Sequence, residues 1–252
     1  MRHYSKTLIG HTGFVGETLK LQASFDGTFS RINMADSKNT FSELLVCSAA
    51  PAQKWWANSN PQEDFDNICN LVTSLESMQA KHAVLISTVD VFDRPIGVDE
   101  DSIPDPSNQN AYGRNRRHLE LEFTKTFEDS MIVRLPGLVG QGLRKNAIFD
   151  LKHDNQTESL NADSKFQFYP MENIWTDLSL ALDNDLEVLH LTSEPISLGE
   201  VAQSIFGVQL SGLPSAARYD FQTKHGKLWD KHGRYQYSAI QSLAAIREYQ
   251  ES

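Results

Sequence analysis

The stretch Thr7-Leu8-Ile9-Gly10-His11-Thr12-Gly13-Phe14-Val15-Gly16, close to the start of the 252-residue chain, decides the fold that we expect for the rest. A short apolar run ends in glycines at the spacing Gly-x-x-Gly-x-x-Gly, and a helical pattern follows to about residue 23. A strand, a glycine turn and a helix start leave backbone N–H groups and the positive end of the helix dipole where a pyrophosphate can bind.

Each glycine has its own part in such a turn. Gly10 allows the tight turn, Gly13 lets a ligand approach the backbone, and Gly16 lets the helix pack closely on the strand. Glycines at this spacing also occur by chance in loops, but the strand directly before them favours a dinucleotide-binding loop. The residues that we expect to contact the dinucleotide here are Gly10, Thr12, Gly13, Phe14, Val15 and Gly16.

The composition describes an ordinary folded protein and excludes some classes of partner. Hydrophobic residues make up 40% of the chain and charged residues 22%, as in globular proteins generally. The net charge of −10 argues against nucleic acid or an anionic membrane as the main partner. Cys47, Cys69, His225 and His232 show no metal-ligand spacing, so we expect neither a disulfide framework nor a metal site. The chain has no apolar leader and no run of membrane-spanning length, so we expect a cytoplasmic protein.

Apolar runs alternate with amphipathic helical patterns along the first part of the chain. The predicted strands cover about residues 6–9, 27–33, 44–47, 83–88 and 131–135, and the predicted long helices cover about 61–78 and 112–127. Strands that alternate with helices predict an α/β fold with a doubly wound parallel sheet. Residues 34–43 are too few for a full crossover helix, so we expect one helical turn or a loop there.

The later part of the chain has fewer and shorter elements. We expect residues 1–142, with a strand at about 186–192, to form a Rossmann-type dinucleotide-binding domain. Residues from about 143 to 185 and from 193 to 252, with short helices over 197–206 and 238–249, are expected to form a small substrate-binding lobe.

Small and polar segments follow several of the predicted strands. In a parallel sheet, ligands bind beyond the carboxyl ends of the strands. The segments 48–51, 87–91 and 136–142 all fall at that edge. The residues that we expect there beside the cofactor are Ser48, Ala49, Ala50, Leu135 and Pro136.

Four motifs occur in order and at sensible spacings. They are the glycine turn, Ser87-Thr88-Val89-Asp90-Val91-Phe92, Ala111-Tyr112-Gly113-Arg114-Asn115-Arg116 and Arg134-Leu135-Pro136-Gly137-Leu138-Val139-Gly140. Together they resemble the extended short-chain dehydrogenase/reductase family of nucleotide-sugar epimerases, dehydratases and reductases, over about residues 6–206. The resemblance implies an NAD(P)-dependent enzyme that passes a hydride to or from a nucleotide-linked sugar. It also implies a possible homodimer built from the helices that begin near Pro61 and Tyr112.

The same resemblance assigns catalytic roles. In that family a Ser or Thr at the end of the fourth strand hydrogen-bonds the reacting oxygen, a role that falls on Thr88. A Tyr acts as general acid or base, a role that falls on Tyr112. A Lys four residues later binds the nicotinamide ribose and lowers the Tyr pKa, and here that position holds Arg116. Tyr112 and Arg116 would then be contacts of the cofactor as well as catalytic residues.

Arg116 is the departure from the family pattern. Bringing the pKa of a Tyr from about 10 to about 7 requires roughly 4 kcal/mol of preferential stabilisation of the phenolate. A nearby cation acts in that direction, and the guanidinium can also hold ribose hydroxyls. It is effectively never deprotonated, however, so it cannot relay a proton as an ammonium can. We therefore keep three hypotheses: an enzyme acting on a nucleotide-linked sugar, a dinucleotide-binding sensor or scaffold protein without turnover, and, by analogy of fold alone, an enzyme of another substrate class such as a carbonyl or flavonoid-type reductase.

Several other residues have a functional and a structural interpretation. Trp55 could stack on a base or sugar or could cover a core, and Asp90 could contact substrate or cap its loop. Arg144 could meet a diphosphate or belong to a solvated turn. Tyr112 and Thr88 could be a packing residue and a strand-end hydroxyl. On the family reading, Trp55, Asp90 and Arg144 are the predicted substrate-binding residues.

The choice between NADP and NAD depends on the end of the second predicted strand. Many dinucleotide folds place there an acidic residue for the ribose 2′-OH or an Arg for a 2′-phosphate. Ser30 and Arg31 offer a hydroxyl and a guanidinium, whereas Asp36 fits the acidic position only by its distance from the glycines. We therefore favour NADP over NAD, although Arg31 could also be a solvated edge residue.

This choice predicts that the protein binds NADPH more tightly than NADH, because the Arg31 guanidinium would pair with the 2′-phosphate. Fluorescence titration of both dinucleotides at one ionic strength measures the two affinities. Tighter binding of NADH would contradict the role given to Arg31.

Overall fold

The structure is a computed structural model, and it describes residues 1–229 and 233–252. Its residues cluster into two compact units. The first unit comprises Met1–Asp93, Ile103–Arg134 and Trp175–Leu189, and the second comprises Arg94–Ser102, Leu135–Ile174 and His190–Ser252. The predicted domain bounds ran to residue 142 without a break, whereas here the segments 94–102 and 135–142 cluster with the second unit. We describe each unit by itself.

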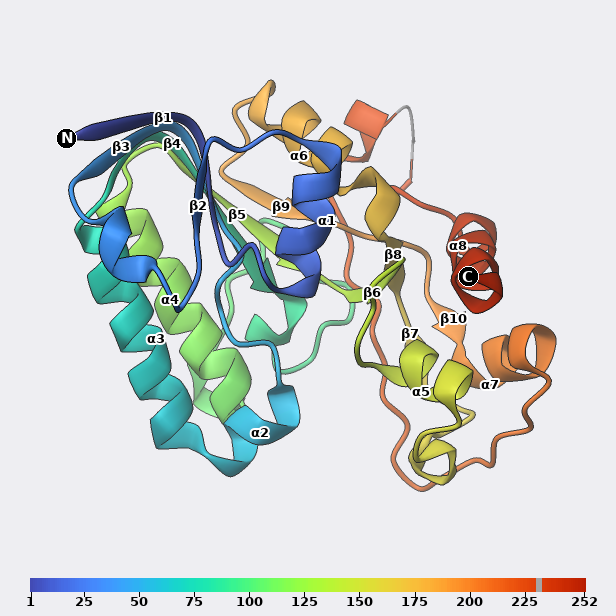
Figure 1. Cartoon of the computed structure of the whole chain (residues 1–252). Helices are drawn as coiled ribbons and strands as arrows, with labels where there is room; N and C mark the ends of the chain where they lie inside the picture. Colours follow the sequence, from blue (N-terminus) through green and yellow to red (C-terminus); the bar gives the residue numbers. More distant parts are fainter. Residues whose placement is uncertain (230–232) are drawn as a thin grey trace. The chain divides into compact units, whose positions relative to one another are not determined.

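A six-stranded sheet forms the centre of the first unit, in the order β2-β1-β3-β4-β5-β9 (Figure 1). The strands are β1 (Arg2–Ile9), β2 (Gly27–Phe29), β3 (Thr40–Cys47), β4 (Gln79–Thr88), β5 (Ser130–Leu135) and β9 (Val188–His190). The pairs β1–β2, β1–β3 and β3–β4 are parallel. The predicted α/β fold with a doubly wound parallel sheet is confirmed. Because β2 lies on one side of β1 and β3 on the other, the strand order reverses at β1, which is where such sheets bind ligands.

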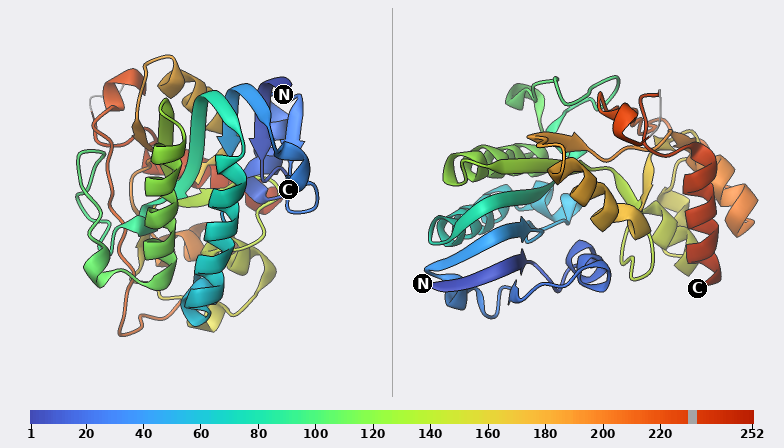
Figure 2. Two further views of the ribbon diagram at one scale, coloured as in Figure 1. Left: turned by 90° about the vertical axis from the view of Figure 1, so that its left-hand side faces the viewer. Right: turned by 90° about the horizontal axis from the view of Figure 1, so that it is seen from above.

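Helices accompany the strands in the expected alternation. The helices of this part of the chain are α1 (Phe14–Gln22), α2 (Lys54–Ser59), α3 (Pro61–Glu76), α4 (Ala111–Thr126) and α6 (Ile174–Leu182). Short 3₁₀ turns η1 (Met34–Ser37), η2 (Val89–Val91) and η3 (Pro106–Asn108) lie between them. Helices α3 and α4 lie side by side against one face of the sheet (Figure 2, left). They correspond to the two long helices that the sequence predicts.

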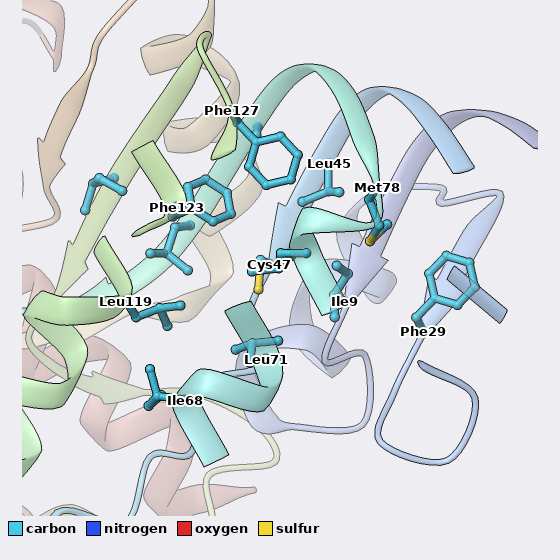
Figure 3. Packing of buried hydrophobic residues seen from close by; sticks show 14 residues of the cluster. Ile9, Phe29, Leu45, Cys47, Ile68, Leu71, Met78, Leu119, Phe123 and Phe127 are labelled. Atoms are coloured by element: carbon cyan, nitrogen blue, oxygen red, sulfur yellow. The ribbon is translucent and has the colours of Figure 1, made fainter. Parts of the chain in front are cut away.

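Strand alternation explains how this face becomes the core. Ile9, Cys47, Leu85 and Ile132 come from four neighbouring strands and share one face, because every second side chain of a strand points the same way. They pack with Phe123 and other side chains from the two long helices (Figure 3). The helix side chains in this cluster are Ile68, Leu71, Leu75, Leu119 and Phe123, all buried.

Three segments differ from the sequence-based expectation. Strand β2 ends at Phe29 rather than continuing to residue 33, because the Asn33 side chain accepts a hydrogen bond from the Ser30 N–H at 2.7 Å. Strands β1 and β3 begin earlier than their apolar runs, and a buried hydrogen bond of 2.6 Å joins Thr7 to Ser42 between them. Trp55 itself lies in the short helix α2. The single 3₁₀ turn η1 agrees with the expected helical turn.

The second unit is built from short pieces. Strand β6 (Gly137–Val139) pairs in parallel with β8 (Phe168–Pro170), and β7 (Lys165–Phe166) pairs antiparallel with β10 (Ile196–Ser197). The remaining elements are α5 (Ala147–His153), η4 (Thr157–Ser159), η5 (Met171–Asn173), α7 (Leu198–Val201), the π-helical turn η6 (Ala202–Phe206), η7 (Gly226–Trp229) and α8 (Ala239–Glu251). Within residues 1–229 and 233–252, no helix is both long and apolar enough to cross a membrane.

The buried cluster predicts that replacing two leucines of the first unit by alanine lowers stability by very different amounts. Leu75 in α3 is 1% exposed and Leu21 in α1 is 83% exposed. We expect Leu75→Ala to lower the free energy of unfolding by about 2–5 kcal/mol, since it leaves a cavity. Leu21→Ala should change it by no more than about 0.5 kcal/mol. Urea unfolding measures both variants, and equal effects would contradict the packing described here.

Candidate active site

The glycine turn after β1 has a shape that only glycine permits. Gly10 has a φ of +88°, and a Cβ there would lie 2.7 Å from the backbone of Ala49. A Cβ on Gly16 would lie 2.2 Å from the Gly10 carbonyl oxygen. A Cβ on Gly13 would meet that oxygen only at 3.6 Å, an ordinary contact. Gly10 and Gly16 are therefore required by the protein's own packing, whereas Gly13 has no such packing requirement.

The start of α1 is open to a ligand. Gly13 is the N-cap of this helix, and no side chain caps it. Thr12 and Gly13 are exposed, and Phe14 and Val15 are half-buried. The first N–H groups of a helix need partners from outside the helix, and here no capping side chain competes for them. This arrangement suits an anionic group such as a pyrophosphate.

The turn after β2 holds the residues predicted to select the cofactor. Ser30 is buried, and its N–H and hydroxyl both donate to Asn33 Oδ1, at 2.7 and 3.2 Å. Arg31 is exposed, as is Asp36 in η1. His11 lies close by, with its Nδ1 3.1 Å from the Phe29 carbonyl oxygen. A carbonyl only accepts, so Nδ1 carries the proton and the ring is turned toward the end of β2.

The segment after β3 lies against the glycine turn. The Ser48 N–H and hydroxyl donate to the Ile9 carbonyl, at 2.8 and 3.0 Å. Ala49 and Ala50 are half-buried. The turns that follow β1 and β3 are thus held together at the point where the strand order reverses.

The structure brings Thr88 and Tyr112 into contact. Thr88 ends β4, and its hydroxyl is close enough to the Tyr112 phenol to lower the pKa of that phenol. The same hydroxyl accepts the Asp90 N–H at 3.2 Å. The adjacent Ser87 hydroxyl donates instead to the buried Glu120 at 2.7 Å. Of these two neighbouring hydroxyls, Thr88 is therefore the one that meets the tyrosine.

Helix α4 places Tyr112 in its first turn. Asn110 caps the helix, since its side chain accepts the Gly113 N–H at 3.0 Å. The Tyr112 N–H donates to Asn58 Oδ1 of α2, also at 3.0 Å. A Cβ on Gly113 would lie 2.1 Å from the Asp90 carbonyl oxygen, so the helix start presses directly against η2. This close approach holds Tyr112 beside the end of β4.

Burial raises the pKa of the Tyr112 phenol, because the phenolate would lose hydration. The Arg116 charge acts in the opposite direction, and the Asp90 carboxylate adds to the rise. The hydrogen bond from Thr88 and the charge of Lys54 lower the pKa by smaller amounts. The net direction is upward, so Tyr112 is a protonated phenol at neutral pH.

Arg116 is committed to protein partners. Its guanidinium donates to both carboxylate oxygens of Asp64, at 2.6 and 2.9 Å, and its Nε donates to the Pro51 carbonyl at 3.1 Å. Its Nη2 also donates to that carbonyl. Arg116 is 2% exposed and Asp64 is fully buried. The guanidinium carbon lies 4.3 Å from the centre of the Tyr112 ring, over the face of the ring. Most of its N–H donors are thus already used inside the protein.

Two charged residues that the catalytic assignment did not include lie at this site. Lys54, the first residue of α2, donates to Asp90 Oδ1 at 2.8 Å. Asp64 is the buried partner of Arg116. Lys54 follows the small-residue segment 48–51 closely, which was a weak sequence signal for its place at the site. No local pattern pairs Asp64 with Arg116, a residue 52 positions away. Trp55 is 69% exposed, and Trp56 is half-buried.

The other predicted site residues belong to the second unit. Leu135 is buried and Pro136 is half-buried, while Arg144 is exposed. His225 lies near its partner Leu228 in a turn, and His232 falls outside the described residues. Among residues 1–229 and 233–252, no three His, Cys, Asp or Glu side chains are grouped to hold a metal ion. Burial raises the pKa of the Cys47 thiol to about 11, which makes it a poor nucleophile.

Solved structures share this whole fold at low sequence identity. A dTDP-4-dehydrorhamnose reductase from Bacillus anthracis str. Ames in complex with NADP has a TM-score of 0.71 at 17% identity, with 99% of this chain and 98% of that chain covered. A UDP-galactose 4-epimerase has a TM-score of 0.72 at 15% identity, with 100% and 98% covered. MoeE5 in complex with UDP-glucose and NAD has a TM-score of 0.73 at 15% identity, with 98% of each chain covered.

These similarities establish the fold. No protein-family model and no curated protein sequence matches the chain. The chain has the Rossmann-type fold found in these nucleotide-sugar reductases and epimerases, so the resemblance that the sequence motifs indicate is confirmed at the level of the fold.

The buried Arg116–Asp64 pair predicts a distinctive stability pattern. Arg116→Leu leaves a buried carboxylate without its partner and should cost about 3–5 kcal/mol of stability. The double variant Arg116→Leu, Asp64→Leu should recover most of that loss, because no unpaired charge remains.

A matched control comes from the Lys81–Glu43 pair, whose side chains are 60% and 59% exposed. Lys81→Met should cost no more than about 1 kcal/mol. Urea unfolding of all four proteins, the native chain included, tests the pattern. A double variant as unstable as Arg116→Leu would contradict it.

Proposed function

We propose that this protein is an NAD(P)-dependent oxidoreductase or epimerase of the extended short-chain dehydrogenase/reductase type that acts on a nucleotide-linked sugar. The observation that carries the proposal is that Thr88, at the carboxyl end of β4, lies beside the Tyr112 phenol and lowers its pKa. It lies in the same unit as the glycine turn, two strands away from β1 in the sheet order. Dinucleotide loop and proton donor thus share one edge of one sheet.

The residues of the glycine turn fit a dinucleotide. The uncapped start of α1 offers N–H groups to the pyrophosphate, and Gly13 leaves space for its close approach. Ser48, Ala49 and Ala50 present only small side chains at the neighbouring strand end, so backbone and ligand can lie close together. In this proposal Leu135, the last residue of β5, and Pro136, which follows it, contribute further contacts.

The proposed chemistry uses the cofactor only for the hydride: when bound, the nicotinamide donates or accepts it. The chain's own residues manage the proton. Thr88 orients the reacting oxygen by a hydrogen bond, and Tyr112 donates a proton to that oxygen or takes one from it. A phenol with a raised pKa is protonated at neutral pH, so Tyr112 starts as a general acid. This favours net reduction of a carbonyl, with epimerisation as the next possibility.

For the cofactor we propose NADP ahead of NAD. Arg31 is exposed at the end of β2, where a 2′-phosphate would meet it, and Ser30 adds a polar neighbour. The similar structures carry NADP in one case and NAD in another, so they support the class of cofactor and not the choice within it.

For the substrate we propose a sugar joined to a nucleoside diphosphate. The similar structures are named for dTDP- and UDP-linked sugars. In this chain Asp90 is a hydrogen-bond acceptor beside Tyr112, and Trp55 exposes an aromatic face. Arg144 is an exposed cation suited to a diphosphate. The homodimer through α3 and α4 stays a prediction.

The rival function is a dinucleotide-binding sensor without turnover. The observation in its favour is that Arg116 is occupied by Asp64 and Pro51, so it does not offer a ribose-binding cation as the family lysine does. The retained pairing of Thr88 with Tyr112 favours the enzyme, because a sensor needs neither group.

The enzyme hypothesis predicts that Tyr112→Phe slows turnover by about 10²–10⁴-fold, since it removes the proton donor. Affinity for NADPH should stay within a few-fold of that of the native protein. Oxidation of NADPH with a panel of dTDP- and UDP-linked keto sugars measures turnover, and titration measures binding. Native protein that binds NADPH but converts no sugar of the panel would support the sensor, and undiminished activity of Tyr112→Phe would remove Tyr112 from the mechanism.

A further inference from the structure

We propose that Lys54, at the start of α2, is the ammonium group that supports Tyr112. Arg116 then anchors the loop that leads into α2. This inference rests on the proposed function. It moves the lysine of the resembled family pattern from the fourth position after the tyrosine to a different helix.

The first step is that Arg116 cannot act as that lysine does. Both oxygens of the fully buried Asp64 accept its N–H groups, so its charge is compensated within hydrogen-bonding distance. It touches the face of the Tyr112 ring and not its hydroxyl. A guanidinium is also effectively never deprotonated, so it cannot pass a proton onward. A group at this position lowers the pKa of the phenol but cannot reload it with a proton.

The second step is that Arg116 and Tyr112 together fix α2 in place. Arg116 donates to the Pro51 carbonyl, just before this helix, and the Tyr112 N–H donates to Asn58 inside it. Lys54 lies between these two attachments. Helix α2 therefore lies beside the start of α4 (Figure 1), and its first residue is held near the tyrosine.

The third step is a pair of polar contacts that ties Lys54 to the turn after Thr88. Lys54 Nζ donates to Asp90 Oδ1 at 2.8 Å. The Asp90 N–H donates to Thr88 Oγ1 at 3.2 Å, and the Thr88 hydroxyl lowers the pKa of the Tyr112 phenol. The Lys54 side chain is 41% exposed and that of Asp90 is 18% exposed. The ammonium thus reaches solvent, from which it can recover a proton, while its partner carboxylate lies close to the reacting group.

The charges around Tyr112 give this assignment a measurable sign. The groups that act on the phenol are Arg116 from α4, Asp90 from η2 and Lys54 from α2, and Asp64 of α3 compensates the first. Asp90 opposes the phenolate, whereas Lys54 favours it. Removing Asp90 should therefore make Tyr112 more acidic, and removing Lys54 should make it less acidic. If the ion pair were only structural, the Lys54 and Asp90 variants would lose the same stability. They would not shift the acidity of Tyr112 in opposite directions.

The test follows the acidity of position 112 directly. A fluorinated tyrosine placed there has a lower intrinsic pKa than tyrosine, which brings its titration into a measurable pH range. ¹⁹F NMR then follows that titration with and without NADPH. We expect Lys54→Met to make the phenol about tenfold less acidic and Asp90→Asn to make it about tenfold more acidic, which is one pKa unit in each direction. The double variant should lie between them.

Kinetics supply the second readout. Lys54→Met should lower kcat by about tenfold at neutral pH, with the alkaline limb of the pH profile, where Tyr112 loses its proton, moved in the same direction as the NMR titration. Lys54→Arg should restore the acidity of the phenol but not the full kcat, because a guanidinium does not relay the proton. Lys81→Met, which breaks an exposed pair with Glu43 elsewhere on the sheet, is the matched control and should change neither readout.

The outcomes separate this inference from the proposed function. If Tyr112→Phe loses activity while Lys54→Met leaves the titration and kcat unchanged, the enzyme stands and the role of Lys54 is wrong. If the native protein turns over no substrate yet the two variants shift the titration in opposite directions, the electrostatic role of Lys54 holds and the proposed function fails. Shifts in the same direction from both variants would also overturn the inference.

Discussion

Helix α4 is held in the protein by two buried ion pairs, and the geometry of the candidate site depends on them. Arg116 pairs with Asp64 of α3, and one helical turn later Glu120 pairs with Arg134 of β5, at 2.9 and 3.0 Å. Taking such charges out of water is costly, so buried pairs contribute little net stability but strongly disfavour other arrangements of their partners. The bidentate geometry of both pairs fixes the rotation of the helix. The position of Tyr112 in its first turn follows from that rotation.

Arg116 anchors neighbouring segments of the protein and is therefore not available to the reacting oxygen. An arginine satisfies both oxygens of Asp64 and the Pro51 carbonyl with one planar group, which a lysine with a single compact charge could not do in that geometry. The same interactions remove the side chain from the reacting oxygen. The helix gains a rigid attachment to the loop before α2, and the site then needs its mobile cation from elsewhere. In our proposal Lys54, at the start of the helix that this loop leads into, is that cation.

Much of the first unit could be predicted from the sequence because its signals are local. The glycine spacing follows from contacts within a few residues of β1, as the approach of Gly16 to the Gly10 carbonyl shows. The apolar runs of β3, β4 and β5 mark strands that are buried on both faces. What local patterns cannot supply is the partner across the fold. Asp64 has no sequence feature that identifies Arg116 as its partner, and Asn58 has none that identifies the Tyr112 N–H.

The short elements could not be predicted from the sequence, for a related reason. Helix α2 has only 6 residues, and β7 and β10 have two each, so none is long enough to show a periodic pattern. Such elements are stabilised by long-range contacts. Gln167 shows this in the second unit, where its side chain bonds the backbone of both Ser193 and Phe221. A glutamine in a short apolar segment gives no hint of that role.

The protonation state of Tyr112 links these points to the direction of the chemistry. Burial holds the phenol protonated, and the buried pair of Arg116 with Asp64 leaves only a compensated charge beside it. A protein that had only to take a proton from a hydroxyl would benefit from a free cation at that position. A protein that gives a proton to a developing alkoxide benefits from a neutral phenol, provided that the phenolate left behind can be stabilised and reloaded. The proposal assigns that second need to the Lys54–Asp90 ion pair, whose cation is partly exposed to water and whose carboxylate belongs to the turn after Thr88.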